Sequence, residues 1–214
     1  MSISTYAELQ TAVDNWMHRD DLTARVPEFI QMGEAVLNRK LRTVDMETRA
    51  TITTGTTSRF LGLPTGFIEM RSMFIQNPAK ELFYLDPQSL RDRIVSETDT
   101  AEPEFFTIKD EIELDCIPST ALTLEQHYLK KYDIATDLTN WLLTNYPELY
   151  LHAALASAVF YIMDDPRLPT IKSLLSEGIA ELNRLEARKR GGHMSKLRVD
   201  SALVGAGRYN ITTG

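Results

Sequence analysis

The stretch LYLHAALASAVFYIM, residues 149–163, is apolar on nearly every side when it is wound as a helix. A surface helix keeps one polar face, whereas a helix that is apolar all round lies inside a protein or in a membrane. Fifteen residues are too few to span a bilayer, and His152 and Ser157 interrupt the run. We therefore predict the central helix of a helical bundle here, with Pro147 in its first turn.

Two further helices are predicted near the N-terminus. The first covers residues 6–17, because Thr5 and Glu8 form a capping-box pattern in front of it. The second follows Pro27 after a polar turn, and we expect the two helices to form an antiparallel pair. The apolar stripes predicted for them are Tyr6, Leu9, Val13 and Trp16 in the first helix, and Ile30, Gly33, Leu37 and Leu41 in the second, with Glu34 and Asn38 outside the stripe.

A last helix is predicted from about residue 169 to residue 190. The sequence DDP at 164–166 separates it from the central helix, and Gly191 with Gly192 suits a helix C-terminus. Because helical patterns occupy both ends of the chain, we expect residues 1–45 and 138–190 to close one four-helix bundle. The apolar stripe of this last helix is Ile171, Leu174, Leu175, Gly178, Ile179, Leu182 and Leu185.

The hydrophobic period changes to that of strands between residues 46 and 137. Residues 67–75, 112–116 and 122–132 alternate between apolar and polar side chains, and residues 51–54 favour strands. We predict an inserted antiparallel β domain that contains one short helix at 87–95, and an α+β fold class overall. Glu69 and Arg71 fall on one face of the 67–75 strand, where they form either a subunit-interface ion pair or an ordinary polar face.

The composition is that of a globular protein: 214 residues, 43% hydrophobic and 25% charged. The N-terminus has no basic segment followed by an apolar run, so we expect no secretory signal and no membrane partner. The single cysteine, Cys116, excludes a disulfide within the chain and alternates with apolar residues, which favours a small core residue.

Catalytic patterns are sparse in the sequence. His18-Arg19-Asp20 resembles part of a protein-kinase catalytic loop, but Arg25 stands where that loop needs asparagine. The four histidines fall on four different predicted elements without a metal-ligand partner at helical spacing. We therefore predict no enzyme, no metal and no cofactor, and place His152 in the core or at a subunit interface.

The last residues, 191–214, have no hydrophobic period long enough to pack by themselves. Residues 188–214 hold six Lys or Arg and one Asp, a net charge of +5, whereas the whole chain carries −7, which leaves −12 on residues 1–187. We predict a C-terminal arm that docks on other subunits, with a disordered basic tail as the alternative. Its expected contacts are the cations Lys196, Arg198 and Arg208 and the apolar anchors Leu197, Val199, Leu203, Val204, Tyr209 and Ile211.

Three stretches, in this helix, sheet, helix and arm order, carry a resemblance to a known family. They are METRA (46–50), LPTGFIEMRS (63–72) and YPELYLHAAL (146–155), supported by YAEL at 6–9 and RDDL at 19–22. With them the chain resembles, from Tyr6 to Val199, the head-to-tail adaptor proteins of tailed bacteriophages, also called connector or head-completion proteins.

The resemblance implies a structural role in the virion neck, after assembly in the host cytoplasm. Such adaptors form a ring of copies, usually twelve, that docks beneath the portal protein through the helical domain and the C-terminal arm. The ring prolongs the channel, through which double-stranded DNA passes without sequence-specific binding, and it presents a surface to the next tail or nozzle component. The family brings no catalytic residues. The alternatives are another ring component of the tail and, from a different class, a cytoplasmic hydrolase.

Overall fold

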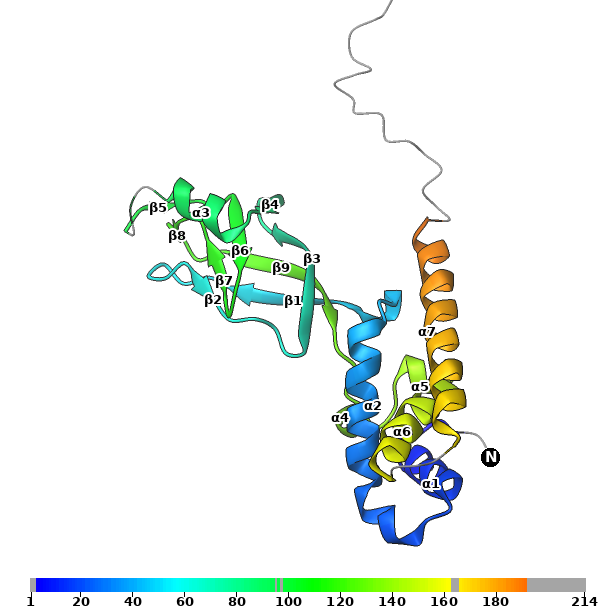
Figure 1. Ribbon diagram of the computed structural model, residues 1–214. Helices are drawn as coiled ribbons and strands as arrows, with labels where there is room; N and C mark the ends of the chain where they lie inside the picture. The colour runs from blue at the N-terminus through cyan, green and yellow to red at the C-terminus, as the bar shows by residue number, and fades with distance from the viewer. Residues whose placement is uncertain (1–2, 95, 97, 163–165, 192–214) are drawn as a thin grey trace, which may run out of the picture.

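The computed structural model describes residues 3–94, 96, 98–162 and 166–191, and it confirms the α+β fold class. A helical body and a sheet that extends to one side of it make up these residues (Figure 1). The helices of the body are α1 (Tyr6–Met17), α2 (Val26–Lys40), α4 (Ile134–Asp137), α5 (Trp141–Asn145), α6 (Pro147–Ile162) and α7 (Leu168–Gly191), with the 3-10 segments Asp20–Arg25 and Val44–Met46.

Helix α6 is the centre of the body, as the sequence predicts. It contacts α1, α2, α5 and α7, so that several of its sides are covered. Its buried residues occupy consecutive positions instead of one stripe, and they are Leu149, Tyr150, Leu151, Ala153, Ala154, Leu155, Ala158 and Val159. Burial of α6 among the other helices therefore explains why its sequence is apolar on nearly every side.

The predicted helix N-termini are also confirmed. The Thr5 hydroxyl accepts a hydrogen bond from the Glu8 backbone amide, and the Glu8 carboxylate accepts one from the Thr5 amide in return. Both bonds satisfy amides that the first turn of α1 leaves without partners. Pro27 lies in the first turn of α2, and Pro147 begins α6.

Gly33 sets how closely α2 approaches α6. A methyl group added there would lie 2.7 Å from both the Ala153 carbonyl carbon and the Ala154 amide nitrogen. We expect Gly33→Ala to lower the free energy of unfolding by about 1–3 kcal/mol, because backbone atoms must move apart. Alanine has a helix propensity about 1 kcal/mol better than that of glycine, which offsets only part of this strain.

Gly178→Ala on α7 is the matched control for that prediction. The added methyl group would meet the end of the Leu149 side chain, Cδ2 at 2.6 Å, which can change rotamer. Thermal unfolding of both variants measures the difference. Equal melting temperatures for Gly33→Ala and the unsubstituted chain would show that α2 and α6 are not locked at this contact.

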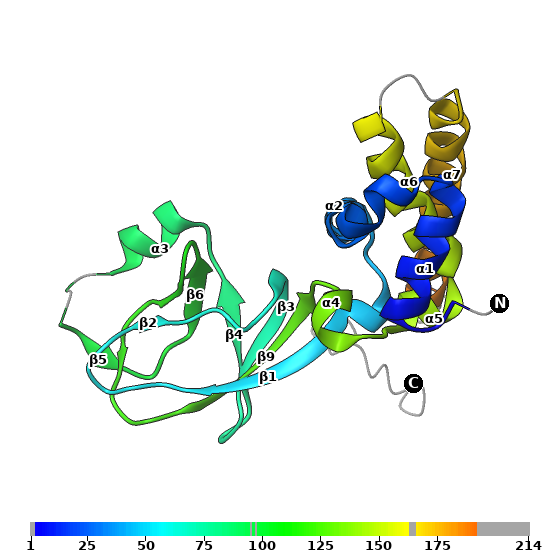
Figure 2. The same ribbon diagram turned by 90° about the horizontal axis from the view of Figure 1, so that it is seen from below.

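Three expectations about the helices are wrong. Figure 2 looks along the axis of α2 while α1 lies across the view, so the two helices cross instead of forming an antiparallel pair; the 3-10 segment Asp20–Arg25 between them redirects the chain. Trp16 and Leu174 lie at the margins of their stripes and are 54% and 45% exposed. Glu34, expected outside the stripe of α2, is buried.

The sheet has seven strands in the order β1-β9-β3-β4-β6-β7-β2. A separate pair joins β5 to β8, and α3 (Pro87–Arg93) is the predicted short helix. The strand bounds are β1 Glu47–Thr53, β2 Phe60–Leu61, β3 Phe67–Ile75, β4 Lys80–Tyr84, β5 Thr100–Ala101, β6 Phe105–Ile108, β7 Ile112–Leu114, β8 Ile117–Pro118 and β9 Thr123–Lys130.

The prediction of strands at 67–75, 112–116 and 122–132 is confirmed by β3, β7 and β9. The predicted antiparallel β domain is confirmed, since most strand pairs are antiparallel. Two pairs, β4 with β6 and β5 with β8, are parallel. Parallel neighbours need a long crossover, and the chain between β4 and β6 contains α3.

The described residues form two hydrophobic cores, one in the helical body and one in the sheet. One joins the helices to Leu129 of β9 and to Tyr132 just after it, and the other lies within the sheet around Met73 and Ile112. Cys116 follows β7 and is half-buried, and burial with the nearby Asp115 carboxylate raises the pKa of its thiol to about 11.

Across the described residues, no helix is both long and apolar enough for a membrane span. Domain boundaries at residues 45 and 138 remain a prediction.

Candidate protein interface

An apolar groove of about 740 Å³ lies where α2, α6 and α7 meet. Its aromatic side chains are Phe160 and Tyr161 at the end of α6, and Phe160 is 72% exposed. Exposed aromatic groups gathered in one concave place indicate an interaction surface more strongly than single exposed apolar residues do. The lining residues are Met32, Val36, Lys40, Ala153, Ala156, Ser157, Phe160, Tyr161, Lys172, Leu175 and Ser176.

Neighbouring side chains lie close to both aromatic rings. The Tyr161 ring lies 5.6 Å from the Phe29 ring, centroid to centroid, and the Arg25 guanidinium lies over it at 5.2 Å. The Lys172 ammonium lies 6.0 Å from the centroid of the Phe160 ring. The Tyr161 ring, packed between Phe29 and Arg25, loses little conformational entropy when a partner covers it.

Glu69 and Arg71 pair within the chain. The Arg71 guanidinium donates to the Glu69 carboxylate at 2.9 Å, and Glu69 also lies 3.6 Å from Arg42. Arg71 lies 3.9 Å from Glu47 on β1. Because these side chains are exposed, the pairs contribute only about 0–1 kcal/mol each. Their participation in a subunit interface stays a prediction.

His152 lies on α6 and is half-buried. Burial lowers the pKa of its imidazole, while the Glu148 carboxylate one turn earlier opposes that shift. A neutral imidazole suits a partly buried position. Its role at a subunit interface is likewise a prediction.

A buried polar network that the sequence reasoning missed joins the start of α4 to α2 and α6. The Glu34 carboxylate accepts from the Tyr150 hydroxyl and from the Ile134 amide, both at 2.8 Å. Asn140 donates to the Tyr150 hydroxyl oxygen at 2.7 Å. Beside it, the Asn38 side chain forms two hydrogen bonds with the backbone of Tyr132. These contacts fix the chain where it leaves β9 for the helical body.

Burial raises the pKa of the Glu34 carboxyl, although the hydrogen bonds from Tyr150 and Ile134 oppose the shift. Asp133 also raises it and Lys131 lowers it. A carboxyl with a raised pKa stabilises the fold most below its unfolded pKa of about 4.3, and that contribution falls as pH rises through the folded pKa.

Glu34→Gln should therefore gain stability relative to the unsubstituted chain as pH rises from about 4 to about 7. The amide keeps an acceptor oxygen for Tyr150 and Ile134 but does not ionise. Urea unfolding of both proteins across this range measures the difference. A difference in unfolding free energy that does not change with pH would show that Glu34 ionises as easily in the fold as in the unfolded chain.

The expected contacts of the C-terminal arm lie outside the described residues. This applies to Lys196, Leu197, Arg198, Val199, Leu203, Val204, Arg208, Tyr209 and Ile211. Gly191, taken from the sequence as the first residue of the arm, is the last residue of α7.

Within the described ranges, no group of three or more His, Cys, Asp or Glu side chains could hold a metal ion. A family model described as "SU10 adaptor protein" matches residues 4–200 of the chain. A comparison with curated proteins found no match. The family match spans the helical body, the sheet and the first residues after α7.

Proposed function

Because the chain belongs to the SU10 adaptor protein family, a family of phage head-to-tail adaptors, we propose that its copies form a ring beneath the portal that joins the head to the tail. It is a structural bacteriophage protein, and its family is not an enzyme family. In the proposed ring, the helical body and the C-terminal arm face the portal, and another surface receives the next tail or nozzle component. Assembly takes place in the host cytoplasm and the product is part of the virion neck.

The observation that carries this proposal is the family match over residues 4–200. The groove between α2, α6 and α7 supports it, because exposed apolar side chains gathered in one place are typical of interaction sites. Charge supports the proposed DNA channel. A chain with a net charge of −7 binds phosphates weakly, which suits DNA that must pass through without being held.

Sedimentation of the purified chain, alone and mixed with the portal protein, tests the proposal. We expect several copies to join the portal in one complex, about twelve if the number is the one usual for head-to-tail adaptors, arranged with closed cyclic symmetry. A chain that stays monomeric in both samples would contradict the proposed function.

A further inference from the structure

We propose that α1 of one copy occupies the groove between α2, α6 and α7 of the next copy. This inference rests on the proposed ring and assigns the two surfaces that build it. The outward face of α1 is the surface beside Trp16. It has no residue in common with the groove, so the contact joins two different surfaces. Repeated contacts between unlike surfaces close into rings when the rotation between copies allows it.

The groove requires an apolar occupant with negative charge. Its large apolar lining residues include Phe160, Tyr161 and Met32, and its charged lining residues are Lys40 and Lys172. No Asp or Glu lies among the lining residues. Two ammonium groups at an apolar groove favour carboxylates on the partner and disfavour cations such as those of the chain's own C-terminal segment.

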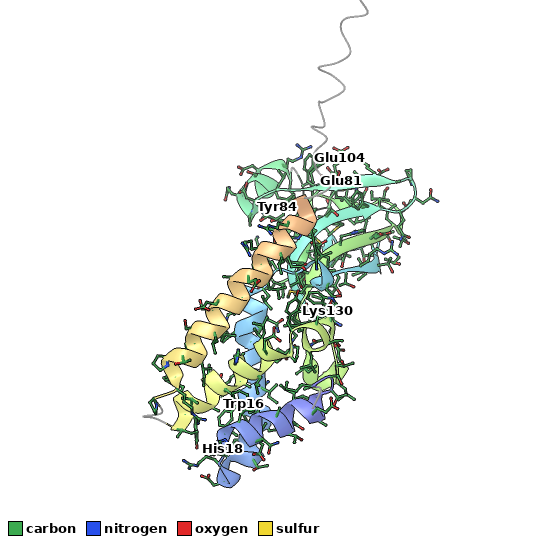
Figure 3. All side chains as sticks on the ribbon, turned by 90° about the vertical axis from the view of Figure 1, so that its right-hand side faces the viewer. Trp16, His18, Glu81, Tyr84, Glu104 and Lys130 are labelled. Carbon is green, nitrogen blue, oxygen red and sulfur yellow. The ribbon has the colours of Figure 1, made fainter. Side chains whose placement is uncertain are left out.

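The outward face of α1 meets this requirement. Leu9, Val13 and Met17 point into the core, while Trp16 on another side of the helix is more than half exposed. Figure 3 shows Trp16 and His18 at the end of the helical body, far from Glu81 and Tyr84 on β4 and from Glu104 just before β6. The surface beside Trp16 carries one charged side chain, the Glu8 carboxylate, and it consists of Ile3, Ala7, Glu8, Thr11, Ala12, Asn15 and Trp16.

The charges and the shapes of the two surfaces both favour this pairing. The Glu8 carboxylate on this face complements the ammonium groups of Lys40 and Lys172, and no residue of the face is Lys or Arg. The small side chains Ala7, Thr11 and Ala12 allow a helix to approach closely, as in recognition of a helix by a groove. Trp16 supplies the large aromatic anchor that carries most of the energy in such contacts.

The end of α1 that presents Trp16 is held in position. Arg167, just before α7, donates to the Trp16 carbonyl oxygen at 3.2 Å. The Thr23 hydroxyl donates to the Asp14 carboxylate at 2.8 Å. The anchor is therefore presented on a helix whose C-terminal turn is fixed before the partner arrives, which lowers the entropic cost of binding.

Disulfide cross-linking between two single-cysteine chains tests the pairing. In a Cys116→Ser background, one chain carries Asn15→Cys on α1 and the other carries Ser176→Cys in the groove; both positions are exposed. After mild oxidation of the mixture we expect a product of twice the chain mass, and none from either chain alone. One chain with both substitutions should give a ladder of products longer than a dimer.

Phe160→Ser gives an independent measurement on the assembly itself. Because Phe160 is largely exposed, we expect unchanged thermal unfolding and an increase of about tenfold or more in the concentration needed for assembly. Phe83→Ser on β4, also exposed but outside both surfaces, is the matched control and should assemble normally.

Absence of the cross-linked product, in conditions where the unsubstituted chain assembles, overturns the pairing and leaves the proposed ring in place. Normal assembly of Phe160→Ser does the same. A chain that remains monomeric alone and on the portal overturns the proposed function, and the pairing with it.

Discussion

Leu155→Ala should lower the free energy of unfolding by about 2–5 kcal/mol. Leu155 lies on α6, is 2% exposed, and belongs to the core that α6 forms with α1, α2 and α7. Removing its methyl groups leaves a cavity that helices packed on several sides can fill only partly. Denaturant unfolding measures the loss, and Leu151→Ala on the same helix should behave similarly.

Leu174→Ala is the matched control. The sequence pattern places Leu174 on the apolar stripe of α7, yet its side chain is 45% exposed. We expect a change within about 0.5 kcal/mol, the usual size for a surface substitution. A change of that small size at both Leu155 and Leu151 would put α6 on the outside of the body and contradict the bundle.

Removal of residues 192–214 should abolish docking on the portal while the body stays folded. Helix α7 ends at Gly191, and its buried residues Leu175, Ile179 and Leu182 all precede the cut. Thermal unfolding of the shortened chain tests the fold, and co-sedimentation with the portal tests docking. A large drop in melting temperature would show that these residues belong to the fold and not to a docking arm.

Charge and apolar contacts in the arm should affect docking differently. Exposed charges are screened within about 8 Å at physiological salt, so they speed association more than they hold the complex. Lys196→Ala with Arg198→Ala should therefore slow association, whereas Leu203→Ala with Tyr209→Ala should speed dissociation. Binding kinetics at two salt concentrations separate these effects. A charge pair that controls dissociation would contradict apolar anchoring.

Sequence periodicity predicted the elements whose side chains face one core. The bounds of α1 and the centre of α6 followed from a capping box and from an apolar run, both local signals. Strands β4 and β6 were not predicted, because Phe83 and Tyr84, like Phe105 and Phe106, are adjacent apolar residues without alternation.

Contacts between distant elements could not be predicted in this way. Glu34 interacts with Ile134 and Tyr150, which lie 100 and 116 residues away, so its burial has no local signal. The groove likewise combines Met32, Phe160 and Lys172 from three helices. One signal of the groove was present in the sequence. Helix α6 is apolar on nearly every side and ends in Phe160 and Tyr161, so part of its apolar surface remains exposed in the folded chain.

Electron microscopy of the virion neck tests the adaptor ring most directly. We expect a closed ring of copies of this chain directly beneath the portal, with the helical bodies side by side around the DNA channel. Placement of the chain elsewhere in the tail, or its absence from the particle, would contradict the adaptor ring.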